Sequence, residues 1–252
     1  MAAPLSPASD LITESWINFR KNLLSYAEFA VWFCLLGLVL WAIFAFTRSI
    51  TPAVEARFGL NLLLGLPVYF LGSVLAIALI ESVAAHVDGR PLDPRTAFGE
   101  GFHKSFSFIW VSLLAGAGVL LGFALVVVPG IVLSVRWRFA QLEMVLENQR
   151  GTAAIKASAR VTEGRFMETL WRLLAPAVFF AVAGIFVTGL IRLLVGAILG
   201  DPGLFFSLYD SAGSLPLSHD LLATLIPTAV NGFLWPLYIG AEYILWRELK
   251  KG

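Results

Sequence analysis

Long stretches of apolar residues without any charge alternate with short polar segments along the chain. Residues 29–46, 58–80, 173–191 and 221–241 are uncharged runs of this kind. A helix needs about 20 apolar residues to cross the ~30 Å hydrocarbon core of a bilayer. Each of the four runs therefore predicts one membrane-spanning helix.

A fifth uncharged run, residues 105–135, is too long for one crossing. As a helix, its 31 residues would extend roughly 46 Å. We expect a turn at Pro129-Gly130, because Pro interrupts the helical hydrogen bonds and Gly tolerates a tight reversal. The chain would then return through residues 131–147, although this segment carries Arg136, Arg138 and Glu143.

The placement of Lys and Arg decides whether this return span is expected. With six spans, both termini and the loops at 81–104 and 148–172 share one side, which holds 13 of the 18 basic residues. Without the return span, eight of them move to the other side. Because short basic loops stay in the cytoplasm, we predict an all-α, polytopic integral membrane protein with six transmembrane helices and both termini cytoplasmic. It would form a single transmembrane domain over residues 1–252, with spans at about 27–47, 58–80, 105–128, 131–147, 171–199 and 221–246.

The N-terminal segment, residues 1–24, contains an amphipathic stretch from residue 10 onward. Its apolar positions recur at helical spacing, at Ile12, Trp16, Phe19 and Leu23. This pattern predicts an interfacial helix that lies on the membrane surface. The alternative is a helical extension of the first span.

A weak internal repeat accompanies the spans. Similar aromatic and basic segments precede the first, third and fifth spans, at 15–21, 99–104 and 162–166. The even-numbered spans end near a glutamate: Glu81, Glu147 and Glu248. The pattern predicts three pseudo-repeated helical hairpins around an axis along the membrane normal. The alternative is that any membrane protein built from hairpins shows this rhythm.

The composition is that of a membrane protein. Hydrophobic residues make up 58% of the chain, charged residues 14%, and the mean hydropathy is +0.82, whereas soluble domains have about 25% charged residues. The net charge of +1 gives no reason to expect a nucleic-acid partner. With Cys34 as the single cysteine, no intrachain disulfide can form, and we expect neither a metal nor a cofactor. We predict a multi-pass protein of the plasma (inner) membrane.

Residues 129–164 resemble a known pattern. The matching positions are Pro129-Gly130-Ile131, Arg136-Trp137, Phe139-Ala140, Leu146-Glu147-Asn148, Gly151, Ala154, Ser158 and Gly164. They are similar to a pattern in six-span bacterial and archaeal membrane proteins, including the membrane domain of some glycerophosphoryl diester phosphodiesterases and the YciC-type inner-membrane proteins. The resemblance implies six spans but no agreed activity. We expect no soluble phosphodiesterase domain in this sequence, so hydrolysis is not implied.

Polar residues within the predicted spans are the candidate site. Arg136, Glu143 and Glu147 share one helical face of the return span, and Asn231 and Glu242 share one in the last span. Intramembrane charges face the bundle interior and mark functional sites by default. Two interpretations remain open: structural ion pairs, or a path for a solute or proton. Arg192 is similarly either an outer-leaflet anchor or part of a site.

Known catalytic sequence patterns are missing, so we do not expect an enzyme. The predicted role is non-catalytic: membrane organisation, or the handling of lipids or a partner protein in the cell envelope. The basic and aromatic segments at 93–104 and 152–166 either attract anionic lipid head groups or are solvated cytoplasmic loops. A protein partner or a homo-oligomer is also expected. The first alternative is a transporter of small solutes or lipids that uses the intramembrane charges. A membrane-embedded hydrolase is the second.

Overall fold

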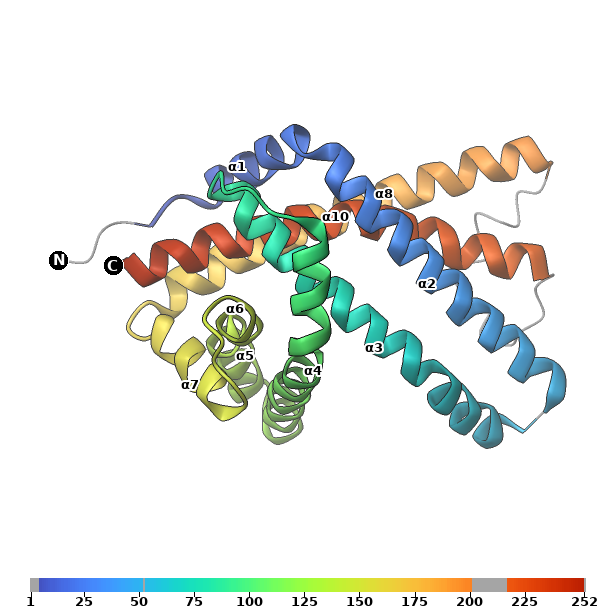
Figure 1. Ribbon diagram of the computed structural model, residues 1–252, viewed down its shortest axis with the longest axis horizontal. Coiled ribbons are helices and arrows are strands. Elements are labelled where there is room, and N and C mark those ends of the chain that lie inside the picture. Colours follow the sequence, from blue (N-terminus) through green and yellow to red (C-terminus); the bar gives the residue numbers. More distant parts are fainter. Residues whose placement is uncertain (1–4, 52, 201–216, 252) are drawn as a thin grey trace. The chain divides into compact units, whose positions relative to one another are not determined.

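The computed structural model describes residues 5–51, 53–200 and 217–251, and its secondary structure over these residues is helical, with no strand (Figure 1). The helices are α1 (Ala8–Lys21), α2 (Leu23–Ile50), α3 (Val54–Val87), α4 (Pro94–Leu125), α5 (Val127–Arg136), α6 (Ala140–Leu146), α7 (Thr152–Val161), α8 (Phe166–Leu199) and α10 (Leu217–Lys251). The all-α prediction is confirmed for this part of the chain.

Within the described residues, five helices are long and apolar enough to cross a membrane: α2, α3, α4, α8 and α10. Four predicted spans, at 27–47, 58–80, 171–199 and 221–246, fall inside α2, α3, α8 and α10, and most of 105–128 falls inside α4. The chain therefore has the helices of a multi-pass membrane protein.

The predicted return span over 131–147 is not one helix. The structure has two short helices there, α5 and α6, separated by Trp137, Arg138 and Phe139. The ten residues of α5 extend about 15 Å, half of the ~30 Å core. Neither six continuous spans nor a threefold repeat is confirmed.

The turn before α5 also differs from the prediction. Val126 lies between α4 and α5 with an extended backbone, φ −160° and ψ 151°, so the chain reverses there and not at Pro129-Gly130. Pro129 is the third residue of α5, where a backbone N–H would have no partner within the helix. Proline is tolerated at such a position.

Glycines let α4 and α5 approach each other closely. A Cβ atom on Gly118 would lie 2.0 Å from the Trp137 ring, and one on Gly122 would lie 3.0 Å from the Cα atom of Gly130. These distances leave no room for a side chain. Gly118 and Gly122, which are four residues apart, therefore form the close helix contact typical of small residues in membrane helices.

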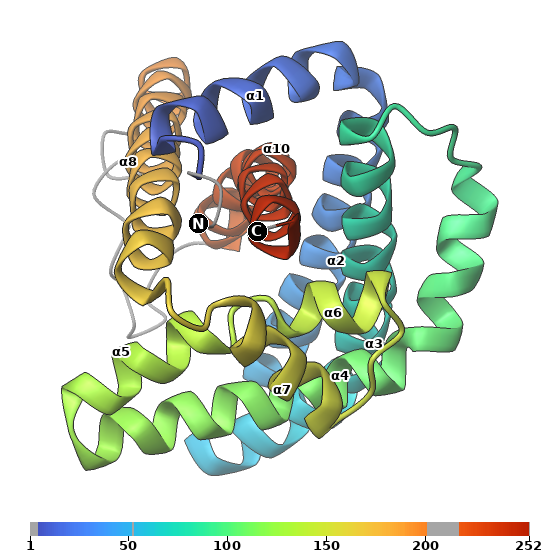
Figure 2. The ribbon, with the colours of Figure 1, turned by 90° about the vertical axis from the view of Figure 1, so that its left-hand side faces the viewer.

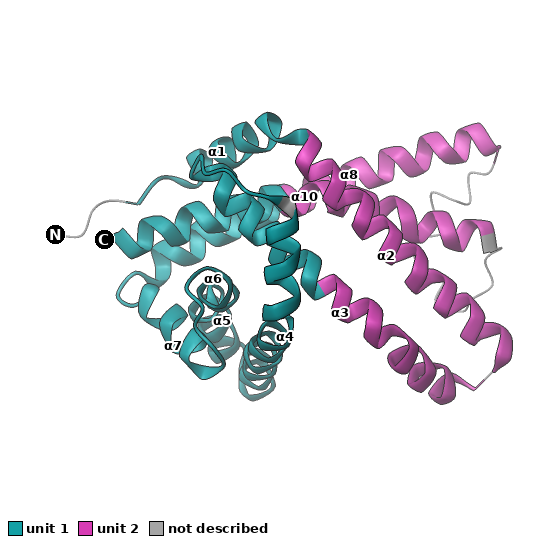
Figure 3. Ribbon diagram, in the orientation of Figure 1, with its two compact units in different colours: residues 1–23, 73–179, 236–252 teal, residues 24–72, 180–235 magenta. Residues whose placement is uncertain are grey.

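The described chain divides into two compact units (Figure 3). Unit 1 comprises residues 1–23, 73–179 and 236–252, and unit 2 comprises residues 24–72 and 180–235. The prediction of a single domain is not tested by this division, because α3, α8 and α10 each contribute to both units.

In unit 1, the C-terminal part of α10 is surrounded by the other helices of the unit (Figure 2). Its side chains Ile244 and Leu245 are almost fully buried. Figure 2 shows this part of α10 nearly end-on, whereas α4 and α5 run across the view. Within unit 1 the α4–α5 hairpin therefore does not run parallel to α10.

Helix α1 packs in unit 1 through one face. Leu11, Ser15 and Phe19 are buried, and the Ser15 hydroxyl donates a hydrogen bond to the Leu237 carbonyl. Trp16 is 48% exposed, so the predicted apolar face is split between the protein and its surroundings. A helix break at Asn22 separates α1 from α2, which argues against a plain extension of the first span. The location of α1 on the membrane surface remains a prediction.

In unit 2, the apolar helices contact one another through side-chain hydrogen bonds and aromatic packing. Thr47 Oγ1 lies 2.6 Å from Asn61 Oδ1 and donates a hydrogen bond to it. The rings of Phe33 and Trp235 pack edge to face, with centroids 4.9 Å apart. Many large apolar side chains of this unit point outward, such as Phe58 at 71% exposed. An apolar exterior is the surface that a lipid bilayer requires.

Candidate functional site

The carboxylate of Glu143 is buried at the centre of a charged cluster in unit 1. Glu143 is only 2% exposed, and its Oε1 accepts a hydrogen bond of 2.9 Å from Trp246 Nε1. Lys250 Nζ lies 3.5 Å from the same oxygen and 2.9 Å from Glu147 Oε1. The predicted site residues Glu143, in α6, and Glu147, at the C-cap of α6, are thus both paired with the end of α10.

A second ion pair joins the α5–α6 junction to α10. Arg138 Nε donates to Glu242 Oε1, and the guanidinium also lies 5.1 Å from the centre of the Tyr238 ring. The side chain of Glu242 is 11% exposed. Arg138 is therefore the partner of Glu242, and the structure pairs Arg136 with none of the three predicted carboxylates.

The two predicted site residues in unit 2 do not form a polar cluster. Arg192 is 4% exposed, and its Nη2 donates a hydrogen bond of 2.7 Å to the Ala223 carbonyl. Its Nε and Nη1 find no partner among the described residues. Burial does not suit an anchor that reaches for head groups, because such a side chain keeps its charge in water. Asn231 is exposed.

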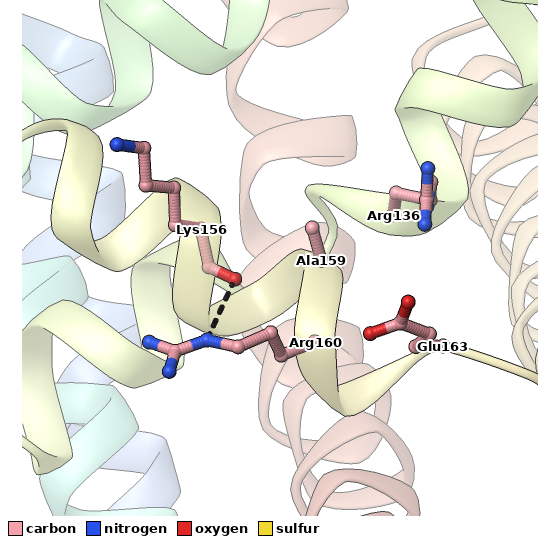
Figure 4. Close-up of a pocket in the computed structure, with 5 residues that line it drawn as sticks. All are labelled: Arg136, Lys156, Ala159, Arg160 and Glu163. Carbon is pink, nitrogen blue, oxygen red and sulfur yellow. Dashed lines mark hydrogen bonds between the residues drawn. The ribbon is translucent and has the colours of Figure 1, made fainter.

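Arg136 instead lines an open pocket in unit 1. The pocket has a volume of about 510 Å³ and is lined by Arg136, Lys156, Ala159, Arg160 and Glu163. The four residues from Lys156 to Glu163 occur at i, i+3, i+4 and i+7, and therefore share one face of α7 and its end. In Figure 4, Ala159 lies between Lys156 on one side and Arg136 on the other.

Ser158 fixes the position of Arg136 against α7. Its hydroxyl is fully buried, donates a hydrogen bond of 2.7 Å to the Arg136 carbonyl, and accepts one of 3.1 Å from the Phe139 amide. These backbone groups belong to the break between α5 and α6. Buried backbone groups need such partners, so Ser158 stabilises the break and places the pocket's two elements side by side.

The other residues of the family-like pattern also have structural roles. Gly151 and Gly164 flank α7 with φ values of +54° and +74°, which favour glycine because it has no Cβ. Gly130 lies against the Phe123 ring, since a Cβ there would be 2.4 Å from it. Pro129 lies in the first turn of α5, and Glu147 pairs with Lys250.

Asp88, which is not among the predicted site residues, forms a further cluster with α10. It accepts hydrogen bonds of 2.7 Å from the Tyr243 hydroxyl, 2.8 Å from Arg247 and 3.0 Å from Arg90. Burial by itself raises the pKa of the Asp88 carboxyl, but the three hydrogen bonds together lower the pKa by more than burial raises it. The pKa of Asp88 therefore lies below its usual value. The cluster ties the end of α3 to the end of α10.

The sequence carries a partial signal for Lys156 and Arg160, and none for Asp88, whose partners Tyr243 and Arg247 are 155 and 159 positions away. The i, i+4, i+7 spacing of Lys156, Arg160 and Glu163 predicts a shared helix face. It does not predict that Arg136 lies beside that face. Among the described residues, no three His, Cys, Asp or Glu side chains come together as a metal site.

Comparison with family models, with curated proteins and with solved structures finds no match for this chain.

Proposed function

We propose that this chain is a non-catalytic protein of the plasma (inner) membrane, with both termini in the cytoplasm, that handles lipids or organises the membrane. The observation that carries this proposal is the pairing of the charges near α10. Glu143 forms an ion pair with Lys250, and Glu242 forms one with Arg138. Arg136, in contrast, lines a pocket together with further basic residues.

The ion pairs argue against a transport path through these residues. A path for a solute or proton needs polar groups that line a water-filled cavity. In unit 1 the carboxylate of Glu143 is 2% exposed and hydrogen-bonded to Trp246. Such a group holds helices together, and it offers no free site for a cargo.

The charge distribution supports the orientation. Basic residues concentrate in the segments after α3, between α6 and α8, and at the end of α10, and the positive-inside tendency assigns these segments to the cytoplasm. The pocket at α7 would then lie on the cytoplasmic side. The resemblance to six-span membrane proteins agrees with a membrane role that needs no catalytic group.

A flux screen with retained native lipids tests the proposal. The purified protein is reconstituted into liposomes, and the uptake of protons and of a panel of small solutes is followed. We expect no flux above that of empty liposomes, and we expect anionic lipid in the purified sample by mass spectrometry. Flux that Glu143→Gln or Glu242→Gln abolishes, in variants that still fold, would overturn the proposal.

Transport remains the second candidate because of Arg192. This residue of unit 2 is 4% exposed, and two of its donor groups lack a partner among the described residues. A buried cation with open donors is the kind of group that binds an anionic cargo. The flux screen therefore includes Arg192→Gln. Anion flux that is present in the wild type and lost in this variant would favour the transporter.

A further inference from the structure

The cations of the α7 pocket differ from the basic residues of unit 1 that pair with buried or neighbouring carboxylates. Lys104 pairs with Glu81 and Glu100, Arg247 with Asp88, and Lys250 with Glu143 and Glu147. In contrast, Arg136, Lys156 and Arg160 form no ion pair with any residue in the part of the chain that the structure describes. These three cations are thus available to a ligand.

We propose that this pocket binds the phosphate monoester of a lipid head group, with Arg136, Lys156 and Arg160 as its ligands. The inference rests on the proposed function, because it names the lipid chemistry that the protein would recognise. Three cations and the carboxylate of Glu163 give the pocket a net charge of +2. A phosphate monoester carries a charge of about −1.5 to −2 near neutral pH, whereas a diester carries only one negative charge and would leave the pocket half neutralised.

The volume of the pocket and the small side chain of Ala159 in its lining suit a head group. Its volume of about 510 Å³ lies within the roughly 300–1,000 Å³ of typical ligand sites. Ala159 is the smallest residue of the lining and lies between the charged side chains (Figure 4). A larger side chain at this position would occupy the space that the phosphate needs.

The position of Arg136 favours a lipid over a soluble phosphate. Val128, Val132 and Arg136 lie at i, i+4 and i+8 along α5 and therefore share one face of the helix. Val128 is 65% exposed and follows the apolar end of α4. An apolar stripe of about 12 Å thus leads from the membrane-facing hairpin to the guanidinium, so that acyl chains can pack along α5 while the phosphate reaches the pocket.

The rigidity of the site comes from Ser158. Its hydrogen bonds to the Arg136 carbonyl and the Phe139 amide hold the end of α5 against the helix that carries Lys156 and Arg160. The backbone positions of the three ligands are therefore set before a ligand arrives. Preorganisation of this kind lowers the entropic cost of binding.

Binding to short-chain lipids tests the proposal directly. The full-length protein in a mild detergent is titrated by calorimetry with dioctanoyl phosphatidic acid, dioctanoyl phosphatidylglycerol, dioctanoyl phosphatidylcholine and inorganic phosphate. We expect phosphatidic acid to bind at least tenfold more tightly than phosphatidylglycerol or inorganic phosphate, and phosphatidylcholine to bind weakest. In Arg136→Gln/Arg160→Gln, the affinity for phosphatidic acid should fall at least tenfold.

Two variants separate this site from general charge and from misfolding. Arg20→Gln removes an exposed cation of α1 in the same unit and should change the affinity less than twofold. Ala159→Leu keeps every charge but fills the pocket, and it should weaken phosphatidic acid binding as strongly as the double variant. Thermal unfolding of each variant shows whether it is folded.

Three results would overturn the assignment. An unchanged affinity in Arg136→Gln/Arg160→Gln, while lipid still co-purifies, would remove the pocket but leave the proposed lipid handling in place. Equal affinity for inorganic phosphate and phosphatidic acid would exclude a lipid ligand. Equal affinity for phosphatidylcholine would exclude recognition of the phosphate charge. Transport activity in the flux screen would instead refute the proposed function, whatever the pocket binds.

Discussion

The contact between Lys250 and Glu143 gives the sharpest stability prediction. The Lys250 ammonium lies 3.5 Å from a carboxylate whose side chain is 3% exposed. At this separation, Coulomb's law with an effective dielectric constant of about 20 gives roughly 5 kcal/mol of gross attraction. Water reduces this value, because the Lys250 side chain is 33% exposed and also pairs with Glu147. We expect a net coupling of about 1.5 kcal/mol between the two residues.

A double-mutant cycle measures this coupling. Lys250→Met leaves the buried Glu143 charge without its cation and should lower the free energy of unfolding by about 3 kcal/mol. Glu143→Gln keeps an oxygen that can accept the Trp246 N–H and should cost about 1.5 kcal/mol. The double variant should cost about 3 kcal/mol and not the additive value of about 4.5 kcal/mol. Unfolding by denaturant in a mild detergent gives these free energies.

Lys251→Met is the matched control. Lys251 is the next residue of the same helix and is exposed, so its replacement should change the free energy of unfolding by less than about 0.5 kcal/mol. If the Lys250 and Glu143 effects are additive, the carboxylate does not interact with the cation. In that case the cluster does not hold α6 against α10, and the Glu143 carboxylate stays free to take part in a transport path.

Two further predictions concern packing and pH. Gly118→Leu should destabilise the protein by about 2 kcal/mol, because a Cβ at this position would lie 2.0 Å from the Trp137 ring. The substitution should also shift the tryptophan fluorescence. An unchanged melting temperature would contradict the close helix contact. In the folded protein the pKa of Asp88 is lowered because Tyr243 and Arg247 donate hydrogen bonds to its carboxylate. The stabilising effect of this carboxylate is therefore fully present above the ordinary pKa of ~3.9. The effect is lost as the pH falls through the pKa that Asp88 has in the folded protein. Asp88→Asn should therefore lower the melting temperature at pH 7 by about 2–4 °C and reduce the loss of stability below pH 4, whereas the same acid profile as the wild type would refute the assignment.

The long apolar helices were predictable because their signal is local. Each of the runs at 29–46, 58–80, 173–191 and 221–241 can satisfy its backbone hydrogen bonds within one helix, as the interior of a bilayer demands. The structure places each of these runs within one helix. Only the helix ends differ, because helices extend beyond the apolar run into polar segments.

The turn between α4 and α5 was not predictable in the same way. Pro129-Gly130 is a strong turn signal, but proline also suits the first turn of a helix. Gly130 is needed for its close approach to Phe123. The actual reversal uses Val126 in an extended conformation, which any residue can adopt. The sequence around Val126 therefore carries no signal of its own.

The prediction that Arg136, Glu143 and Glu147 share one helix face is wrong for a related reason. The difference determines which of the charged residues are available to a ligand. The stripe of Arg136, Glu143 and Glu147 assumed one continuous helix, but the break after Arg136 changes the direction of the side chains that follow. Arg138 in the break and Glu143 beyond it meet partners on α10 that are 104 and 103 positions away in sequence. No local spacing could reveal those contacts.

Arg136 precedes the break and is held beside α7 by Ser158. The break therefore separates charges that stabilise the fold from charges that stay available to a ligand. Mutations at Glu143 or Glu242 should act mainly on stability, because their charges are already paired. Mutations at Arg136 or Arg160 should act mainly on binding, because their guanidinium groups make no ion pair among the described residues. A lipid-binding pocket at α7 requires this division of effects. A transport path along α10 would give the opposite division, in which mutations at Glu143 or Glu242 act mainly on activity.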